Sequence, residues 1–407
     1  MALAHPILDS KEIAAAKASK TEGVPGWDAI ANIEDLRELA RNRVPKTFFE
    51  YVEAGSYDEI TLGANRSALD ALELRQQVMV DVSSRVQATT IVGQPVSLPV
   101  ALAPAGLTGA VYPNGEIHAA QAAEAFGVPF CLSTMSVCSI EDVAAAVAKP
   151  FWFQLYLMKD RGFSQSLIER AHAARCPVLV LTMDLHVEGQ RTADVHNGLG
   201  IPPRLTLTNI LDIAKHPRWA FGMVRSKEYT FGNLKDAIRN SGNLGILSEW
   251  VKQQFDPSFD RSDLEWVRKL WPGKLIVKGI LDPQDAEIAV AAGADAVLVS
   301  NHGGRQLDGA PSTVEAFPPI RDAVGDRTEL LFDSGIRSGL DVLKALALGA
   351  RACFIGRAYL YGLGARGKVG VCKALSLISE ELDTGMALTG VTDVKAVSRD
   401  VLVHPDE

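Results

Sequence analysis

The stretch Val178-Leu179-Val180-Leu181-Thr182 indicates the fold of this 407-residue chain. Its four consecutive apolar residues leave no polar face, so a strand formed here must be buried on both sides. Strands of this kind are typical of parallel sheets that are covered by helices. Further runs of this kind, with helical patterns between them, would indicate such a sheet.

Short apolar runs and helical patterns alternate through most of the chain. We predict strands at residues 98–103, 128–132, 151–155, 178–182, 274–278, 296–300, 329–333 and 352–355. We predict helices at 115–126, 140–148, 163–174, 283–292 and 339–348. Eight strands in such an alternation indicate an α/β fold of the (β/α)8 TIM-barrel type, with an open doubly wound sheet as the alternative.

Two parts of the chain lie outside this repeat. Within one domain spanning 1–407, we expect residues 1–95 to form an N-terminal helical cap, with helices near 33–41 and 47–54, and residues 96–390 to form the barrel. Residues 199–261 are an insertion after the fourth strand, far longer than a usual βα loop.

The insertion mixes aromatic and basic residues. It carries Trp219, Phe221, Met223, Arg225, Lys227, Tyr229 and Phe231. Such a mixture can bind a membrane surface, but the aromatic side chains of an ordinary folded loop can equally pack on the barrel. The sequence leaves both interpretations open.

Composition narrows the partners and the compartment. The net charge of −8 argues against a nucleic-acid partner, which requires a basic surface. Five cysteines with no CxxC pair indicate a reducing compartment. Residues 1–20 lack the order of a signal peptide, and no run approaches the roughly 18 apolar residues that span a bilayer. We expect a cytoplasmic protein, with peripheral membrane contact left open.

Polar residues follow strand after strand, where a barrel places its catalytic groups. They are Ser133, Thr134, Gln154, Tyr156, Thr182, Asp184, Lys278, Ser300, His302, Arg305, Asp333, Gly356 and Arg357. Each alone has a simpler explanation, such as a capping hydroxyl or a solvated charge. Their recurrence at successive strand ends favours a shared site.

The last two strands indicate a phosphate site. Asp333-Ser334-Gly335-Ile336-Arg337 and Gly356-Arg357 bring small residues and guanidinium groups to the loops where barrels commonly bind phosphate. Glycine lets backbone N–H groups approach phosphate oxygens, and arginine can bind them in a bidentate manner. The alternative is a turn glycine beside surface arginines.

Lys278, His302 and Arg305 suggest the reaction. A lysine at the end of an apolar strand needs a negative charge nearby, which a reduced flavin would supply; a Schiff-base lysine is the rival role. His302 is three residues before Arg305, so a base of near-neutral pKa would lie beside a cation that can hold a carboxylate. This pattern suits a 2-hydroxy acid, with Asp184 orienting the imidazole. A structural histidine is the alternative.

Longer motifs support this interpretation. They include Ala103-Pro104-Ala105-Gly106, Phe153-Gln154-Leu155-Tyr156, Lys278-Gly279, Ser300-Asn301-His302-Gly303-Gly304-Arg305-Gln306-Leu307-Asp308 and Ile355-Gly356-Arg357. Between about residues 44 and 390, the sequence resembles the FMN-dependent L-2-hydroxy acid dehydrogenase and oxidase family. That family includes glycolate oxidase, mandelate dehydrogenase and bacterial L-lactate dehydrogenases.

The resemblance implies a role for each matching residue. FMN contacts are expected from Pro104, Ala105, Gly106, Ser133, Gln154, Thr182, Lys278, Ser300, Asp333, Ser334, Gly335, Arg337, Gly356 and Arg357. On the substrate side, Tyr51 and Arg305 would hold the carboxylate, Tyr156 would bond the hydroxyl group, and Arg191 would add positive charge. His302 would be the base and Asp184 its partner.

Within that family, the sequence most resembles the bacterial respiratory L-lactate dehydrogenases. This implies oxidation of L-lactate to pyruvate, with electrons passing to a quinone or cytochrome, peripheral attachment to the inner face of the cytoplasmic membrane, and a homotetramer or octamer. The alternatives are an oxidase of glycolate or mandelate type that uses O2, and a non-catalytic FMN-binding barrel.

Some positions depart from the family pattern. Met135 stands where glycolate oxidases have tryptophan, which leaves the substrate's side chain open. Ser334 replaces a common glycine of the phosphate loop. Residues 185–190 differ from the usual proline-containing turn, which weakens the assignment of Arg191.

Overall fold

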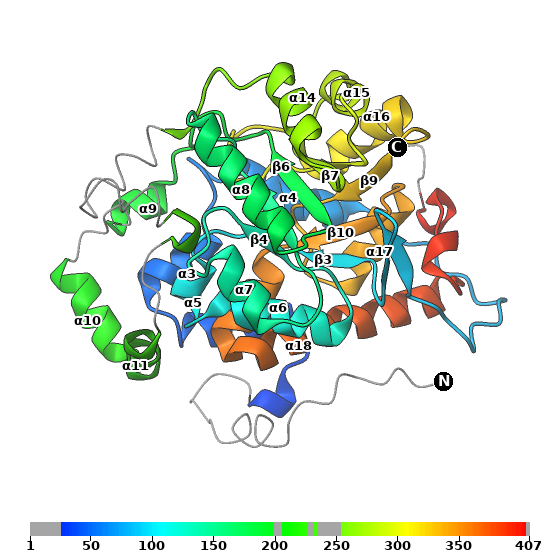
Figure 1. Ribbon diagram of the computed structural model, residues 1–407. Helices are drawn as coiled ribbons and strands as arrows, with labels where there is room; N and C mark the ends of the chain where they lie inside the picture. Colours follow the sequence, from blue (N-terminus) through cyan, green and yellow to red (C-terminus); the bar gives the residue numbers. More distant parts are fainter. Residues whose placement is uncertain (1–25, 199–205, 227–230, 235–253, 404–407) are drawn as a thin grey trace.

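Eight parallel strands form a barrel in the computed structural model, which describes residues 26–198, 206–226, 231–234 and 254–403 (Figure 1). They are β3 (Val100–Leu102), β4 (Cys131–Ser133), β5 (Trp152–Leu155), β6 (Val178–Thr182), β7 (Lys274–Ile280), β8 (Ala296–Val299), β9 (Glu329–Phe332) and β10 (Ala352–Ile355). The strand order is β3-β10-β9-β8-β7-β6-β5-β4. A parallel bridge between Leu102 and Phe130 joins the two ends of this order. The predicted (β/α)8 barrel is confirmed, and the doubly wound alternative is wrong.

The strands are buried on both faces, as the apolar run in β6 predicts. Val178 and Val180 pack inside the barrel with Ile276 of β7. Leu179 and Leu181 belong to the larger core between the strands and the surrounding helices. One run of apolar residues therefore fills two separate packing layers.

A hairpin closes one end of the barrel. Strands β1 (Thr89–Ile91) and β2 (Gln94–Val96) pair antiparallel, and Ile91 joins the interior cluster with Trp152 and Phe354. The Gln94 side chain accepts a hydrogen bond from Trp152 Nε1 at 3.1 Å. Trp152 and Gln94 lie where β5 begins, so the hairpin fills the amino-terminal end of the barrel. The carboxyl ends of the strands remain for polar groups.

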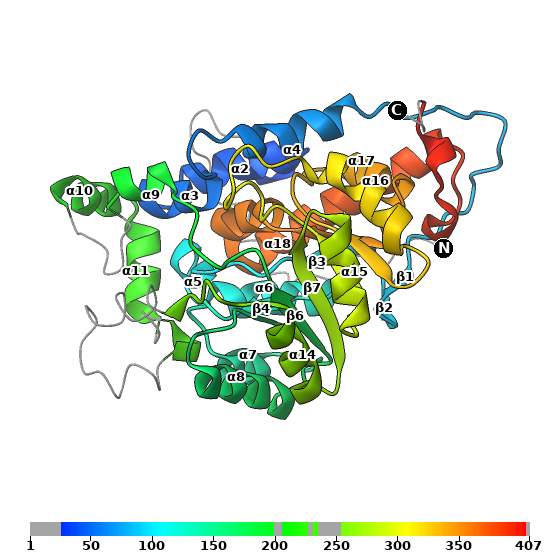
Figure 2. The same cartoon turned by 90° about the horizontal axis from the view of Figure 1, so that it is seen from above.

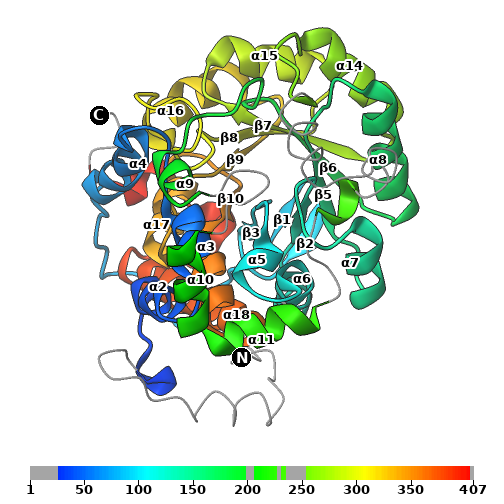
Figure 3. The same ribbon diagram turned by 90° about the vertical axis from the view of Figure 1, so that its left-hand side faces the viewer.

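Helices surround the strands (Figure 3). They are α5 (Thr108–Val111), α6 (Gly115–Phe126), α7 (Ile140–Ala146), α8 (Arg161–Ala173), α14 (Arg261–Leu270), α15 (Pro283–Ala291), α16 (Thr313–Val324), α17 (Gly339–Ala347) and α18 (Arg357–Leu388). The five predicted barrel helices are confirmed with small shifts at their ends. Helix α18 has a kink at Arg366 and Gly367, where the backbone dihedrals are not helical.

The N-terminal segment is helical, as expected. After the short turn η1 (Trp27–Ala29) come α2 (Ile33–Arg41), α3 (Lys46–Glu53) and α4 (Ile60–Ala71). The backbone N–H of Ser56, just after α3, donates to the Gly304 carbonyl at 2.8 Å. This segment therefore touches the loop that follows β8. The C-terminal turns η3 (Val394–Ala396) and η4 (Arg399–Val401) also pair with it, through bridges Val86–Asp393 and Leu74–Leu402.

The described part of the insertion, together with the loop before it, forms α9 (Thr192–His196), α10 (Leu207–Lys215), α11 (Pro217–Arg225) and η2 (Gly232–Leu234). Helices α10 and α11 project at one side of the molecule, near α3 (Figure 2). Trp219 stacks on Phe48 of α3, and Phe231 is buried, whereas Phe221 is 62% exposed. Of these aromatic residues, Trp219 packs on α3, Phe231 is buried, and Phe221 faces outward.

The predicted residues Lys227 and Tyr229 lie outside the described part of the chain. Among the helices that the structure describes, none combines the length and apolar character required to cross a bilayer.

Candidate active site

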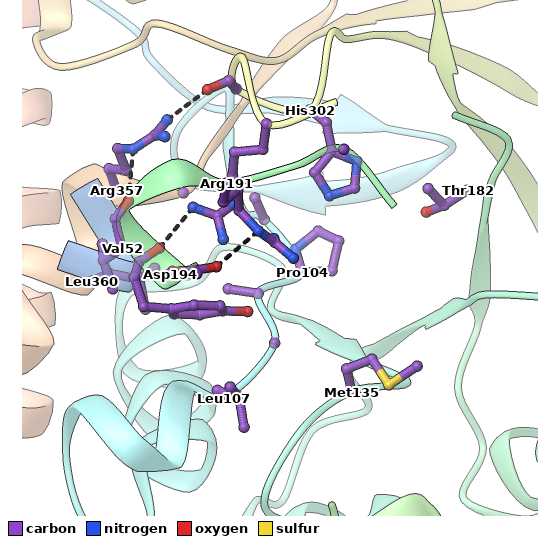
Figure 4. Close-up of a pocket in the computed structure, with 18 of the residues that line it drawn as sticks. Val52, Pro104, Leu107, Met135, Thr182, Arg191, Asp194, His302, Arg357 and Leu360 are labelled. Atoms are coloured by element: carbon purple, nitrogen blue, oxygen red, sulfur yellow. Dashed lines mark hydrogen bonds and ion pairs between the residues drawn. The ribbon is translucent and has the colours of Figure 1, made fainter. Parts of the chain in front are cut away.

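A cavity of about 730 Å³ lies at the carboxyl ends of the barrel strands (Figure 4). Its lining includes most of the predicted site residues: Tyr51, Pro104, Ala105, Gly106, Tyr156, Thr182, Arg191, Lys278, His302, Arg305, Asp333, Ser334, Gly335, Arg337, Gly356 and Arg357. The remaining four, Ser133, Gln154, Asp184 and Ser300, each hydrogen-bond to a residue of the lining or to one another. The volume falls within the typical range for ligand pockets, roughly 300–1,000 Å³.

His302 stands between a carboxylate and a phenol. Its Nδ1 lies 2.9 Å from Asp184 Oδ1, and its Nε2 lies 3.4 Å from the Tyr156 hydroxyl. Its backbone φ is 60°, and the backbone N–H donates to Ser300 Oγ at 3.0 Å. Non-glycine residues seldom adopt positive φ, so the loop after β8 holds the backbone of His302 in an uncommon conformation.

The charge states of His302, Asp184 and Tyr156 suit a role of His302 as a base. Burial lowers the pKa of His302 below its ordinary value, although the charge of Asp184 acts in the opposite direction. Burial alone would raise the pKa of Asp184, but His302 and Lys278 hold it below its usual range. Burial raises the pKa of Tyr156, so its hydroxyl stays protonated. At neutral pH, a neutral imidazole faces an ionised carboxylate.

Two arginines flank the ring of Tyr51. The Arg305 guanidinium carbon lies 4.8 Å from the ring centroid, and that of Arg191 lies 5.8 Å from it. Arg305 Nη1 donates to the carbonyls of Tyr51 and Ala54, at 2.7 and 2.8 Å. These bonds fix one side of the guanidinium. A planar carboxylate entering between the two arginines and the Tyr51 hydroxyl would meet donors on several sides.

Asp194 is a pocket residue that the sequence analysis did not single out. Its Oδ2 lies 2.9 Å from Arg191 Nε, and Arg191 also pairs with Glu188. Oδ1 of Asp194 is buried and has no hydrogen-bond partner among the described residues. Glu188, Arg191 and Asp194 are spaced by three positions, but Glu188 and Arg191 precede α9, so helical spacing could not have revealed both contacts.

A chain of polar contacts runs beneath the cavity. Lys278 Nζ lies 3.0 Å from Ser300 Oγ and 3.5 Å from Asp333 Oδ2. On the other side, Ser133 Oγ donates to Gln154 Oε1 at 3.1 Å, and Gln154 Nε2 donates to Thr182 Oγ1 at 3.0 Å. The buried Lys278 thus has an acidic partner within the protein, and the two sets of polar contacts lie at the carboxyl ends of six strands, β4 to β9.

The predicted phosphate loops lie side by side, but Arg357 has an additional task. Its Nε, Nη1 and Nη2 donate to the carbonyls of Val52, Gly303 and Ala54, at 2.8, 2.9 and 2.9 Å. Three of its five N–H groups are therefore used within the protein. The backbone at the N-terminus of α18, next to Gly356, offers N–H groups to an anion.

Ser334, where the family has a common glycine, occupies a conformation that favours glycine. Its φ is 82°, and its Oγ accepts a hydrogen bond from the Gly303 N–H at 3.0 Å. This bond ties the loop after β9 to the loop of His302.

The apolar side of the cavity contains Met135. Leu107, Met135 and Phe255 pack against a small cluster formed by Phe231 and Leu234 of the insertion. Figure 4 shows Met135 and His302 on different sides of the open space. A substrate side chain that contacted Met135 would therefore lie away from His302.

Comparison with known proteins agrees with this geometry. Residues 40–404 match the family model described as FMN-dependent dehydrogenase. An L-lactate dehydrogenase of Caulobacter vibrioides is 48% identical over 376 residues, which cover 92% of this chain and 98% of the relative. An L-lactate dehydrogenase of Haemophilus influenzae is 44% identical over 375 residues, with the same two coverages.

Solved structures give the same result. The crystal structure of the monotopic membrane protein (S)-mandelate dehydrogenase matches with a TM-score of 0.88 and 40% identity, covering 92% of this chain and 99% of that one. A mandelate oxidase mutant with (S)-mandelic acid matches with a TM-score of 0.77 and 34% identity, covering 92% and 98%. The chain therefore belongs to the FMN-dependent dehydrogenase family.

Proposed function

We propose that this protein oxidises an L-2-hydroxy acid, foremost L-lactate, to the 2-oxo acid. The observation that carries the proposal is the placement of His302, paired with Asp184, in one cavity with Arg305 and Tyr51. A base and a carboxylate-binding pair are the two groups that a 2-hydroxy acid requires.

Each residue has one task in this reaction. Arg305 and Tyr51 hold the carboxylate, Arg191 adds positive charge, and the Tyr156 hydroxyl bonds the substrate oxygen. Neutral His302 accepts a proton at Nε2 while its Nδ1–H donates to Asp184. The ionised Asp184 then stabilises the imidazolium that forms. Holding the substrate by its carboxylate orients the carbon that is oxidised, which is the main benefit of a positioned clamp.

The residues present fit FMN. A phosphate suits the positive φ angles of Ser334 and Gly335 and the backbone N–H groups in the first turn of α18. Arg337 lines the cavity beside them. Asp333 suits a ribityl hydroxyl. The buried Lys278 and the polar side chains of Ser133, Gln154, Thr182 and Ser300 suit the polar edge of a flavin ring. Pro104, Ala105 and Gly106, which line the cavity, suit the face of the ring. When bound, FMN supplies the two-electron acceptor.

L-Lactate is the proposed substrate because the relatives named L-lactate dehydrogenase are 44–48% identical over nearly their whole length. Because mandelate enzymes are also similar to this chain, a larger 2-hydroxy acid is the alternative substrate. Steady-state kinetics with L-lactate, glycolate and (S)-mandelate test the choice. We expect the highest kcat/KM for L-lactate, and a preference for mandelate would replace it. If none of the three bleached the FMN-loaded protein, the proposed function would be wrong.

We further propose a quinone or cytochrome as the electron acceptor, rather than O2. After anaerobic reduction by L-lactate, reoxidation by air is compared with reoxidation by a quinone analogue in stopped flow. Rapid reoxidation by air would identify an oxidase instead.

The cellular placement is also a proposal. We infer that the protein is cytoplasmic and attaches peripherally to the inner face of the membrane through residues 199–261, as a homotetramer or octamer. The exposed Phe221 and Val224 of α11 support attachment. Light scattering of the purified protein measures the oligomer, and a monomeric mass would contradict it.

A further inference from the structure

The short turn η2 of the insertion packs behind the apolar wall of the cavity. We define the apolar wall by four residues that line the cavity: Leu107, Met135, Phe231 and Phe255. Phe231 and Leu234 form a buried cluster, and the other three wall residues pack on it. The insertion therefore supplies one residue of the wall and the layer behind it.

The apolar wall borders the place where the substrate is held. A Cβ added to Gly106 would lie 3.2 Å from the Tyr51 hydroxyl and 3.3 Å from Met135 Cβ. Phe255 meets the Tyr156 ring edge-on, with 6.3 Å between the ring centroids. A 2-hydroxy acid with its carboxylate at Tyr51 and its hydroxyl group at Tyr156 would turn its side chain toward this wall. The position of the wall therefore decides which side chain fits.

Asn233 of η2 is a fully buried amide that holds the loop after β4. Its Nδ2 lies within hydrogen-bond distance of three acceptors in that loop. They are the carbonyls of Ser133 and Thr134, at 3.3 and 3.4 Å, and Ser136 Oγ, at 3.0 Å. Met135 lies between Thr134 and Ser136, so one side chain fixes the chain on both sides of it.

The turn itself is anchored to the helices that follow. Oδ1 of Asn233 accepts from the Ile140 N–H at 2.9 Å, and the Asn233 carbonyl accepts from Arg170 Nη1 at 3.0 Å. Ile140 begins α7, and Arg170 belongs to α8. A Cβ on Gly232 would lie 2.6 Å from the Val137 carbonyl oxygen, so the turn and the loop meet backbone to backbone. Asn233 therefore links two barrel helices to the loop that carries Met135.

We propose that Asn233 is a positioning residue for the reaction, which sets the apolar wall at Met135 and so the side chain that the substrate can carry. This rests on the proposed function and gives the insertion a task in substrate choice, besides its proposed contact with a membrane. Asn233 acts through Met135 and does not touch the substrate. Without the amide, the buried carbonyls of Ser133 and Thr134 lose a donor, and the loop shifts to regain one.

Two matched substitutions in the FMN-loaded full-length protein test the proposal. Asn233→Ala removes the amide behind the wall. Gln87→Ala removes another buried amide, which bonds the carbonyl and the hydroxyl group of Ser379 and does not line the cavity. Both variants lose buried hydrogen bonds, so a general loss of folded protein should appear in both.

The readout is the ratio of kcat/KM for L-lactate to kcat/KM for glycolate, which lacks the methyl group. One methylene group in an apolar pocket changes kcat/KM by about 10–200-fold. We therefore expect the ratio to fall at least about fivefold in Asn233→Ala and to stay within about twofold of the parent in Gln87→Ala. A ratio in Asn233→Ala that matched the parent would overturn the proposal, since a merely structural role lowers both values alike.

A second variant and a measurement without substrate cover the other outcomes. Asn233→Asp keeps an acceptor for the Ile140 N–H but loses the donor, and should lower the ratio in the same way if Asn233→Ala fails to fold. Hydrogen exchange followed by mass spectrometry should be faster in residues 134–140 of the folded variant, and unchanged there in Gln87→Ala. Unchanged exchange in the Asn233 variant would overturn the proposal even if neither acid bleached the parent protein. Failure to bleach the parent would instead overturn the proposed function.

Discussion

His302 Nδ1 lies 2.9 Å from Asp184 Oδ1, and this contact fixes which nitrogen of the imidazole carries the proton. The ionised carboxylate can only accept, so Nδ1–H is the donor and Nε2 keeps its lone pair. Nε2 faces the Tyr156 hydroxyl at the substrate end of the cavity. The base is thus prepared before the substrate arrives.

Replacing the base should slow reduction of the cofactor. In His302→Ala, we expect the rate of anaerobic FMN reduction by L-lactate to fall about 10²–10⁴-fold, the usual contribution of a general base. FMN content should be unchanged, because the side chain is expected to contact the substrate. The matched control is His196→Ala on α9, an exposed histidine outside the cavity lining. Reduction at the parent rate in His302→Ala would refute the assignment.

Asp184→Asn should alter the pH profile. Because the base acts when neutral, kcat/KM should rise with pH through the pKa of His302, which burial holds below about 6.5. The Asp184 charge raises that pKa, so its removal should move the acid limb to lower pH. The plateau should also fall by about tenfold or more, since the tautomer is no longer held. An acid limb that moved to higher pH would contradict this.

Position 334 should separate backbone strain from hydrogen bonding. Ser334→Ala and Ser334→Gly both lose the bond from the Gly303 N–H, but only alanine keeps a Cβ at φ 82°. A left-handed conformation costs a non-glycine residue roughly 1–2 kcal/mol. We expect Ser334→Ala to have a free energy of unfolding about 1 kcal/mol lower than Ser334→Gly, measured in urea at fixed FMN. Equal stabilities would show that the position is not strained.

Arg357→Lys should weaken the protein more than its conservative nature suggests. An ammonium group cannot reach three separate carbonyls, and each buried acceptor left unpaired costs about 1–3 kcal/mol. We expect the free energy of unfolding to fall by about 2–4 kcal/mol, with weaker retention of FMN. Arg327→Lys, at a half-exposed surface arginine, is the control and should stay within about 0.5 kcal/mol of the parent.

Membrane attachment should depend on the outer face of α11. In the double variant Phe221→Asp with Val224→Asp, two exposed apolar side chains become charged. Each apolar side chain that a bilayer buries contributes about 1.5–3 kcal/mol, so the membrane-bound fraction should fall at least about tenfold. Turnover with a soluble dye should persist. Ile288→Asp on α15, also exposed and apolar, should leave attachment unchanged. If the parent protein were already fully soluble at low salt, the prediction would be wrong.

Much of the barrel could be predicted from the sequence because each strand is continuously apolar. The run Val178–Thr182 coincides with β6. The hairpin of β1 and β2 could not be predicted in the same way. Its strands are three residues each, and they gain their stability from packing beneath Trp152 and Phe354, which is a long-range contact. Helices α10 and α11 were missed because a mixed aromatic and basic pattern is compatible with several conformations.

Most of the candidate site could be predicted, since carboxyl ends of strands meet in a barrel. The resemblance added Tyr51 and Arg191, which spacing alone could not place, and the structure brings both to the cavity. The structure also shows two sets of contacts that neither the residue pattern nor the family resemblance indicated. Arg357 donates three hydrogen bonds to backbone carbonyls, and Asp194 of the short helix α9 forms an ion pair with Arg191. Such contacts depend on side-chain directions that only the folded chain determines.

The three carbonyls that Arg357 binds belong to segments far apart in the chain, at Val52, Ala54 and Gly303. During synthesis, the first two leave the ribosome long before Arg357 does. The contacts that Arg357 makes to the loop of His302 and to the N-terminal helices therefore form only after the start of α18 has been made. A chain that is truncated before α18, or stalled on the ribosome, should neither retain FMN nor turn over substrate. The complete site can therefore form only after the last barrel strand, β10, has been translated.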